Sequence, residues 1–377
     1  MDIKEFKAGQ WIQQYNYKSF SPSKINIEWI ISNPQINQLL EEANLKLGEL
    51  NALSTIVPDV DLFIKMHILK EAVNSSKIEG TRTDIEEAAL KEKDIEPEKK
   101  NDWEEVQNYV RAMNDAIDKL KRLPISTRLI KHVHKILLTS VSGYHKRPGE
   151  FRESQNWIGG ATIQDAVFVP PHHTELNDLL SDLEKFINNA QIKVPHLIRV
   201  ALIHYQFETI HPFLDGNGRV GRLLITLYLV SNGLVSKPTL YLSDFFEKNR
   251  QLYYDNLSNV HSKNQLEQWI KFFLIAIIET SKNAVATFKK ILILRKEIEE
   301  EKILKLNKKT PLAKRFVNYL YSQPVITLQD VIDELSVTKP TANALITDFV
   351  NLEILKETTG KKRNRIYTFE KYLNLFK

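Results

Sequence analysis

The chain has 377 residues, of which 42% are hydrophobic and 26% are charged, an ordinary composition for a globular protein with more than one domain. It contains no cysteine, which excludes disulfides, thiolate nucleophiles and thiolate metal sites. The net charge of +5 is concentrated in residues 308–377, where twelve Lys/Arg stand against seven Asp/Glu, so any nucleic-acid interaction belongs to this tail.

The sequence gives no sign of membrane insertion. The N-terminus lacks the apolar core of a signal peptide. The strongly apolar runs at 223–230 and 272–278 are shorter than the ~20 residues that span a bilayer. We therefore expect a soluble, cytoplasmic protein that does not bind membranes.

Most of the chain shows helical periodicity. The first thirty residues look irregular, and Thr83 with Glu86 forms the pattern of a capping box. The segment 143–173 differs because glycines and prolines separate short β-prone pieces, which predicts a hairpin near Trp157–Pro171. Apolar spacing predicts helices at 36–53, 61–80, 83–92, 103–120, 127–140, 174–190, 195–209, 221–233, 244–260, 264–283 and 284–306.

The tail has a different pattern. Helices are expected at 311–322, 327–335 and 339–352, followed by two β-prone arms around a basic tip. This order is typical of a winged helix-turn-helix. The fold class is therefore mainly α, and the predicted division is a helical extension (1–100), a helical core with an inserted hairpin (101–283), a connecting helix (284–309) and a winged helix (310–377).

One stretch, HPFLDGNGRVGR at 211–222, combines groups suited to phosphate chemistry. It lies between two predicted helices, so its second half forms a helix N-terminus, where backbone N–H groups favour anions. Gly216 and Gly218 allow close approach of the backbone, and Asn217 supplies a side-chain donor or a left-handed turn position. Arg219 and Arg222 share one face of the first turn and suit forked contacts to phosphate oxygens.

Three further side chains of this stretch have separate chemistry. Asp215 is a hard oxygen ligand for Mg²⁺. His211 can accept a proton near neutral pH and so activate a hydroxyl. Phe213 is expected to turn inward and anchor the loop. A simple Gly-Asn-Gly turn with surface ion pairs is the alternative, but it leaves the combination of base, ligand and guanidiniums unexplained.

The stretch resembles the signature HPFx[DE]GNGRxxR of Fic-domain proteins, position by position. The resemblance implies a Fic helical bundle with a β-hairpin flap, and transfer of AMP from ATP to a Ser, Thr or Tyr hydroxyl of a protein, including itself, with Mg²⁺ as cofactor. His211 would be the base, Asp215 the metal ligand, and Gly216, Asn217 and Gly218 the anion cradle. Arg219 would bind the phosphates and Arg222 the γ-phosphate. The phosphate-transferring Doc-like branch has Lys where this chain has Gly216.

Two other segments fit this resemblance. The flap that holds the target backbone would lie at 156–171. Its target-binding residues would be Ile158, Gly159, Gly160, Ala161 and Thr162. The adenine-side helix would present Tyr253, Tyr254 and Leu257, although core packing explains the tyrosines equally. His261 stands where family members often have Asn.

An upstream segment, SSKIEG at 75–80, resembles the inhibitory [ST]xxxE[GN] motif of Fic proteins. Ser75 and Glu79 are one helical turn apart, and Gly80 can close that helix. Glu79 paired with Arg222 would occupy the guanidinium that the γ-phosphate of ATP needs. In some relatives the same glutamate positions a water that removes AMP.

Other interpretations remain open. Lys339, Thr341, Asn343 and the basic tip (Lys361, Lys362, Arg363, Arg365) could contact DNA, but docking of a protein or of a second copy of the chain explains the tail equally. The main activity could instead be AMP removal or transfer of another phosphate-linked group, or the core could be a nucleotide sensor in a DNA-binding regulator. The pairs His132–His134 and His172–His173 lack a metal-ligand spacing and are expected to be packing or surface residues.

Overall fold

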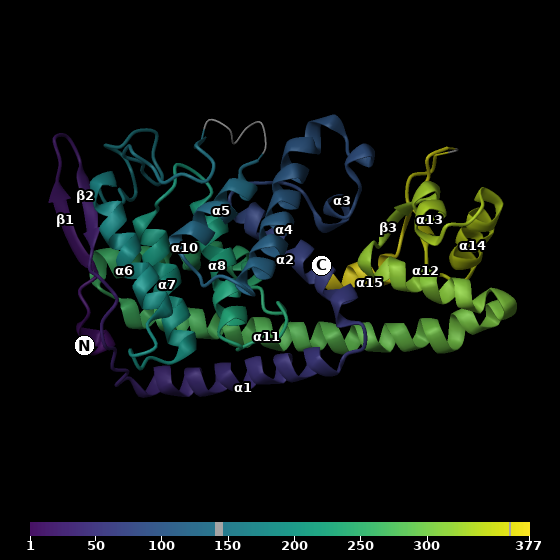
Figure 1. Cartoon of the computed structure of the whole chain (residues 1–377), viewed down its shortest axis with the longest axis horizontal. Helices are drawn as coiled ribbons and strands as arrows, with labels where there is room; N and C mark the ends of the chain where they lie inside the picture. The colour runs from purple at the N-terminus through teal and green to yellow at the C-terminus, as the bar shows by residue number, and fades with distance from the viewer. Residues whose placement is uncertain (140–145, 362) are drawn as a thin grey trace.

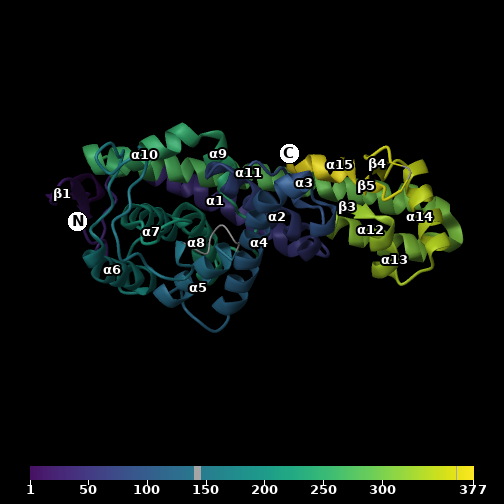
Figure 2. The ribbon, with the colours of Figure 1, turned by 90° about the horizontal axis from the view of Figure 1, so that it is seen from above.

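The protein is an elongated, mainly helical molecule. Its computed structural model describes residues 1–139, 146–361 and 363–377. Three parts of the predictions lie outside these ranges: the last residue of the predicted helix 127–140, the start of the segment 143–173, and Lys362. A small hairpin stands at one end of the molecule, and the helices between residues 310 and 351 lie at the other end (Figures 1 and 2).

The helical body follows the predicted periodicity closely. Two helices, α7 and α8, are buried on nearly all sides and form its centre. No helix within the described ranges is both long and apolar enough to cross a bilayer. The helices of the body are α1 (Pro34–Ile56), α2 (Val60–Ile78), α3 (Ile85–Ala88), α4 (Lys100–Leu120), α5 (Thr127–Leu137), α6 (Leu176–Asn188), α7 (His196–Ile210), α8 (Asn217–Ser231), α9 (Ser243–Lys248), α10 (Arg250–Lys263) and α11 (Leu266–Lys296).

The N-terminal thirty residues are not irregular, so that prediction was wrong. They contain an antiparallel hairpin of β1 (Gly9–Gln13) and β2 (Lys18–Pro22). Phe20 of β2 is buried, whereas β1 is largely exposed. The strands are too short and too polar to produce a clear alternation in the sequence, and their stability comes from packing on the helical body.

Helix α3 is shorter than predicted, and its cap lies one residue later. Asp84 accepts the backbone N–H of Glu87 (2.8 Å), and the Glu87 carboxylate accepts the N–H of Asp84 (3.4 Å). The predicted Thr83–Glu86 box does not form, because Asp84–Glu87 satisfies the same pattern with a stronger acceptor at the N-cap.

Two other boundaries also differ from the predictions. The helix predicted at 244–260 is two helices, α9 and α10, because Asn249 leaves the helical conformation (φ −114°, ψ 35°). Conversely, α11 continues through position 283 to Lys296, and π and 3-10 turns follow to Lys309. Helix α1 runs along α11 for much of its length (Figure 1). The four-part domain division remains a prediction.

The C-terminal segment contains the three predicted helices and a small antiparallel sheet of order β3–β5–β4. Lys361, Arg363 and Arg365 lie in the connection between β4 and β5, and Asp348 is paired with Lys309 (2.6 Å). The winged-helix interpretation and its contact with DNA remain predictions. The elements are α12 (Thr310–Ser322), β3 (Val325–Thr327), α13 (Leu328–Leu335), α14 (Lys339–Asn351), β4 (Lys356–Glu357), β5 (Ile366–Thr368) and α15 (Glu370–Leu373).

Candidate functional site

The loop between α7 and α8 carries the residues of the HPFLDGNGRVGR stretch. His211 ends α7 in the left-handed conformation (φ 48°), and Gly216 precedes α8 in the same region (φ 75°). Left-handed backbone is disfavoured for most side chains, so glycine suits the second turn. The loop thus brings the imidazole of His211 and the N-terminus of α8 to one place.

The side chain of Asn217 closes this loop. Its Nδ2 donates to the Phe213 carbonyl (2.8 Å), and its Oδ1 accepts the Phe213 N–H (2.8 Å). The Asn217 side chain thus holds the loop together, and Gly216 instead of Asn217 takes the left-handed position. The backbone N–H of Asn217 remains in the first turn of α8, where such groups have no acceptor within the helix. Phe213 is fully buried, which confirms that it turns inward.

His134 supports the loop from α5. Its ring stacks on Phe213 at 3.7 Å. Its Nδ1 accepts the N–H of Gly149 (2.9 Å), so Nε2 carries the proton and donates to the Asp215 carbonyl (3.0 Å). Burial lowers the pKa of His134 to about 4, which keeps the ring neutral. It is a packing residue, as the sequence predicted.

His211 is held in one orientation. Its Nδ1 lies 3.3 Å from the Glu208 carbonyl oxygen, which can only accept, so Nδ1 carries the proton. Nε2 is then the lone-pair nitrogen. Burial, together with the charge of Arg152, lowers the pKa of His211 to about 4. The imidazole is therefore neutral and able to accept a proton at physiological pH.

Arg152 is a residue that the sequence analysis missed. It is 2% exposed and donates to four backbone carbonyls: those of His211 (3.0 Å), Ser154 (3.2 Å), Pro171 (2.6 Å) and Ile210 (3.4 Å). Burial lowers its pKa to about 10, so it stays charged at neutral pH. Arg152 thereby connects the end of α7 to the residues that flank the segment predicted as the flap.

Arg222 and Glu79 form an ion pair across the site. The Arg222 guanidinium donates from Nη2 to Glu79 Oε1 (2.6 Å) and to the Ser75 carbonyl (2.9 Å), and from Nε to Ser75 Oγ (2.9 Å). Arg222 is 2% exposed. Burial raises the pKa of Glu79, but the charge and hydrogen bond of Arg222 outweigh it and the pKa is lowered. Glu79 is thus ionised in the folded protein.

Glu79 also covers the start of α8. A Cβ atom placed on Gly218 would lie 2.3 Å from Glu79 Oε1, so the carboxylate rests against this glycine. Gly80, which follows, has a positive φ (107°) and ends the helix that presents Glu79. The Glu79 carboxylate therefore occupies the first turn of α8, a position that favours negative charge.

Arg219 and Asp215 lie on the neighbouring side. Arg219 Nη1 donates to Glu105 Oε2 (3.0 Å), and its Nη2 is 3.9 Å from Asp215 Oδ1. The Asp215 side chain is half exposed, and its Oδ1 accepts the Gly216 N–H (2.6 Å). Within the described ranges no cluster of three or more His, Asp or Glu side chains could hold a metal by itself. A single exposed carboxylate still fits Mg²⁺, which completes its shell with phosphate oxygens and water.

The aromatic residues of α10 differ in their exposure. Tyr253 is 1% exposed and its hydroxyl bonds His204 Nε2 (2.8 Å), so it fills the core and does not line a nucleotide site. Leu257 is also buried, whereas Tyr254 is 38% exposed. His261 is stacked on Phe168 (4.2 Å) and bonded to Thr209 (2.9 Å), so it is not available for base recognition. Of the three side chains predicted on the adenine side, only Tyr254 is exposed, and its contact with the base remains a prediction.

The predicted flap pairs at a single bridge, between Ile158 and Phe168, instead of forming two strands. Gly159 (φ 68°) and Gly160 (φ 75°) turn the chain away directly after the bridge. The tip is then organised by Asp165, whose carboxylate accepts the backbone N–H groups of Ala161 (3.0 Å) and Thr162 (2.7 Å). Residues 159–162 are exposed.

A loop that joins a neutral imidazole, two arginines and a helix N-terminus defines a candidate anion-binding and proton-accepting site. Residues 37–118 match the Fic/DOC family N-terminal domain, and residues 124–229 match the Fic/DOC family. The chain therefore contains a Fic domain, preceded by a Fic N-terminal domain.

The curated relatives share this region. A protein adenylyltransferase Fic of Aedes aegypti is 32% identical over 160 residues, which are 42% of this chain and 27% of that protein. The Drosophila grimshawi protein of the same name is 35% identical over 115 residues, 30% of this chain and 22% of that protein. The chain therefore matches only about a quarter of the length of these relatives.

Solved structures share the fold. A Fic family protein from Desulfovibrio desulfuricans G20 superposes with a TM-score of 0.57 at 19% identity, covering 90% of this chain and 97% of that one. A Fic domain containing signaling protein from Bacteroides thetaiotaomicron VPI-5482 gives 0.55 at 20% identity, covering 68% and 97%.

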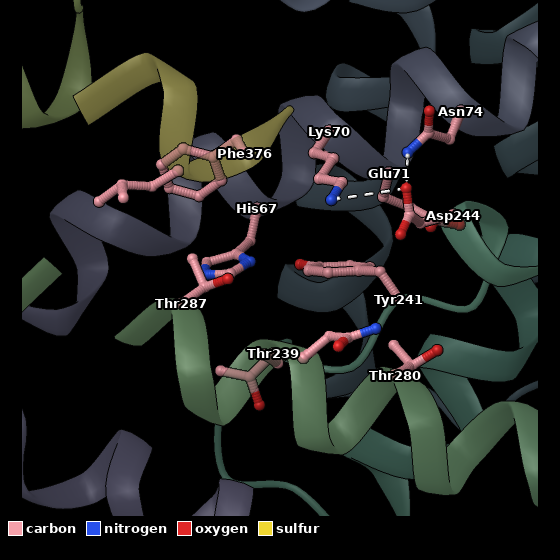
Figure 3. A pocket seen from close by; sticks show the side chains of 13 residues that line it. His67, Lys70, Glu71, Asn74, Thr239, Tyr241, Asp244, Thr280, Thr287 and Phe376 are labelled. Carbon is pink, nitrogen blue, oxygen red and sulfur yellow. Dashed lines mark hydrogen bonds and ion pairs between the residues drawn. The ribbon is translucent and has the colours of Figure 1, made fainter. Parts of the chain in front are cut away.

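A separate cavity lies behind α2 (Figure 3). His67 and Glu71 of α2, Tyr241 and Phe376 line it, and α11 contributes Thr287. Glu71 accepts from Tyr109 (3.1 Å) and from Ser243 Oγ (2.5 Å). None of the residues of the HPFLDGNGRVGR stretch lines this cavity, so it is distinct from the site described above.

Proposed function

We propose that this chain transfers AMP from ATP to a hydroxyl group of a protein side chain, and that Glu79 keeps it inactive. The observation that carries the proposal is the Arg222–Glu79 ion pair (2.6 Å) beside the neutral imidazole of His211. Relatives named protein adenylyltransferase Fic support the same chemistry.

In this proposal the α8 N-terminus binds the triphosphate. Arg219, Arg222 and the N–H groups of the first turn contact phosphate oxygens. His211 Nε2 takes the proton of a Ser, Thr or Tyr hydroxyl, and the oxygen attacks the α-phosphorus. The bond between the α-phosphorus and the bridging oxygen to the β-phosphate breaks, and pyrophosphate leaves. The product is a phosphodiester between AMP and the side chain.

Asp215 would hold the magnesium ion. When bound, Mg²⁺ neutralises charge on the phosphates and orients them. The chain's own part is to present the Asp215 carboxylate beside the first turn of α8, where Arg219 is also directed.

Inhibition follows from the ion pair. With Glu79 bound, the Nε and Nη2 groups of Arg222 are already occupied, and a negatively charged phosphate would meet the ionised carboxylate resting on Gly218. ATP then binds weakly or with its α-phosphate misplaced. Removal of the carboxylate frees the guanidinium.

The test compares the wild type with Glu79→Gly and His211→Ala, using ATP labelled at the α- or γ-phosphate and Mg²⁺. We expect Glu79→Gly to raise α-label on the chain itself by tenfold or more (~1.4 kcal/mol per tenfold), and His211→Ala in that background to abolish it. Equal labelling of wild type and Glu79→Gly would contradict inhibition by Glu79. Transfer of γ-label instead would indicate phosphorylation, and no label at all would favour a nucleotide sensor.

A further inference from the structure

The β1–β2 hairpin has one free edge. In the described part of the chain, β1 pairs with β2 on one side and with no strand on the other. β1 lies at the extreme end of the molecule in both views (Figures 1 and 2). An unpaired edge presents a row of backbone donors and acceptors to any extended chain that reaches it.

The alternation of hydrogen-bonded pairs between β1 and β2 shows which backbone N–H and C=O groups face this edge. Gln14 donates its N–H to the Tyr17 carbonyl (2.8 Å), and Ser23 donates to the Ala8 carbonyl (2.9 Å). Bonded pairs alternate along an antiparallel ladder in which Trp11 lies opposite Phe20. The N–H and C=O groups of Trp11 and Gln13 therefore point away from β2.

This edge lacks the usual protection against pairing. Proteins usually prevent pairing at an exposed edge strand with lysine, proline, a β-bulge or a covering element. The β1 sequence GQWIQ contains no charge and no proline. The Trp11 side chain is 45% exposed, and Tyr15 at the tip is fully exposed. Trp and Tyr are the side chains enriched at the energetic centres of protein interfaces.

The hairpin is continuous with the predicted flap. On the other side of β2, Phe20 donates its N–H to the Val169 carbonyl (2.9 Å). The Trp11 ring lies 5.9 Å from that of Phe168, the residue that closes the flap bridge. The free edge of β1 thus stands about two strand spacings, ~10 Å, from the flap.

The same aromatic cluster reaches the catalytic loop. Phe168 is stacked on His261, and His261 bonds Thr209, two residues before His211. The family resemblance assigns the target backbone to the flap, and a chain that extends from the flap past Val169 reaches the hairpin. The N–H groups of Ala161 and Thr162 in the flap are already bound by Asp165, so a second contact at the hairpin would add binding area for a target.

We propose that the free edge of β1, with Trp11 and Tyr15, is a docking site for an extended segment of the protein substrate, added as a further strand beside the hairpin. The proposal rests on the proposed function, because it assigns the segment to the protein that receives AMP. The docked segment would lie several residues from the acceptor hydroxyl, since the edge is ~10 Å from the flap.

The test uses Glu79→Gly as the active background and adds Gln13→Pro, Gln13→Ala or Trp11→Ala. Proline at 13 removes an outward N–H without breaking a bond to β2, and alanine at 13 is the matched control that keeps it. Each variant is incubated with α-labelled ATP and a whole-cell lysate. The readouts are the label on lysate proteins relative to label on the chain itself, the thermal midpoint and the solution mass.

We expect Gln13→Pro and Trp11→Ala to lower this ratio about tenfold, the effect of losing a central interface contact, and Gln13→Ala to lower it less than twofold. Equal ratios in all variants, with matching thermal midpoints, would overturn the proposal. So would a change in solution mass caused by Gln13→Pro, because the edge would then pair two copies of the chain. If the chain labels itself but no lysate protein is labelled, the docking site alone is overturned. If the Glu79→Gly chain does not label itself, the proposed function is overturned as well.

Discussion

His211, the proposed base, is held in place by contacts made through its backbone and its Nδ1 atom. The Glu208 carbonyl selects the tautomer with a free Nε2, and Arg152 binds the His211 carbonyl. Both contacts come from residues outside the HPFLDGNGRVGR stretch. The stretch thus contains the proposed base, whereas the orientation of its ring depends on residues outside the stretch.

The pH dependence of transfer should reflect the lowered pKa of His211. The base is active when neutral, so activity is present above the pKa and is lost as the pH falls through about 4. In the Glu79→Gly background we expect kcat/KM to be nearly constant from about pH 8 to pH 6 and to decline below about pH 5, because the pKa is about 4. Initial rates at subsaturating ATP measure this profile. A midpoint near 6.5, the ordinary value for imidazole, would show that burial does not act on the free enzyme.

Arg152→Lys should reduce both stability and transfer. A lysine has one ammonium group and cannot serve four carbonyls from a planar fork. We expect the free energy of unfolding to fall by about 2–4 kcal/mol, since buried acceptors are left unsatisfied. Transfer in the Glu79→Gly background should fall about 100-fold because His211 and the flap shift. Chemical denaturation and label incorporation measure the two effects.

Arg147→Lys is the matched control for that substitution. Arg147 is exposed and pairs with Glu150 and Glu153 (both 2.7 Å), so its replacement should change stability by less than about 0.5 kcal/mol. If Arg152→Lys were as mild as this control, the anchoring role of Arg152 would be wrong.

Among the elements, α2 would control the site in the proposed function. It presents Glu79 at its C-terminal end and Ser75 one turn earlier, and both contact the guanidinium of Arg222. Ser75→Ala should remove one acceptor from the inhibited state and cost that state about 1 kcal/mol. We expect auto-labelling to rise about three- to tenfold, as measured with α-labelled ATP.

Ser76→Ala is the control for this prediction. Ser76 is equally buried, and within the described part of the chain its hydroxyl has no hydrogen-bond partner. Labelling by Ser76→Ala should therefore match the wild type. A similar increase in both variants would mean that general loosening of α2, and not the Ser75 contact, releases the site.

The sequence predicted most helices because they are long and periodic. It missed the β1–β2 hairpin, whose five-residue strands show no clear alternation and are stabilised by contacts with Phe168 and Val169 far along the chain. It also missed the break at Asn249, which is a matter of backbone conformation at one residue. The local sequence pattern therefore identified most helices, whereas tertiary packing determined where they begin and end.

The candidate site divides in the same way. His211, Asp215, Arg219 and Arg222 lie within one short stretch, so their types and spacing carry the signal. Arg152 donates to backbone carbonyls, which every residue has, so no sequence motif identifies its role. Tyr253 has the right spacing for an adenine wall but fills the core, since periodicity does not distinguish a buried face from a pocket.

At the scale of the whole molecule, α2 connects the C-terminal segment to the site. Its first half packs on the C-terminal aromatics: Phe63 lies 5.1 Å from Tyr321, and His67 lies 5.0 Å from Phe376 (Figure 3). Its second half carries the Arg222 contacts. The position of the C-terminal residues and the position of Glu79 are thereby set by one helix.

Phe376→Ala should test this connection. The ring is 2% exposed, so its loss should lower the free energy of unfolding by about 3–5 kcal/mol. Because the contact steadies α2, we also expect auto-labelling to rise severalfold in the chain that has Glu79, but not in the Glu79→Gly chain, where no carboxylate remains to be released. Denaturation curves and α-label incorporation provide the two measurements.

Phe349→Ala separates this effect from loss of stability. Phe349 is fully buried against Phe316 (4.5 Å) within the C-terminal helices, so its truncation should destabilise the protein by a similar amount. It does not contact α2 through that ring pair, and labelling should stay at the wild-type level. The connection would be contradicted if auto-labelling rose in both variants, or if it rose for Phe376→Ala even without Glu79. Either result would show that the C-terminal segment does not act through α2. The inhibitory contact would then depend on the N-terminal and core helices alone.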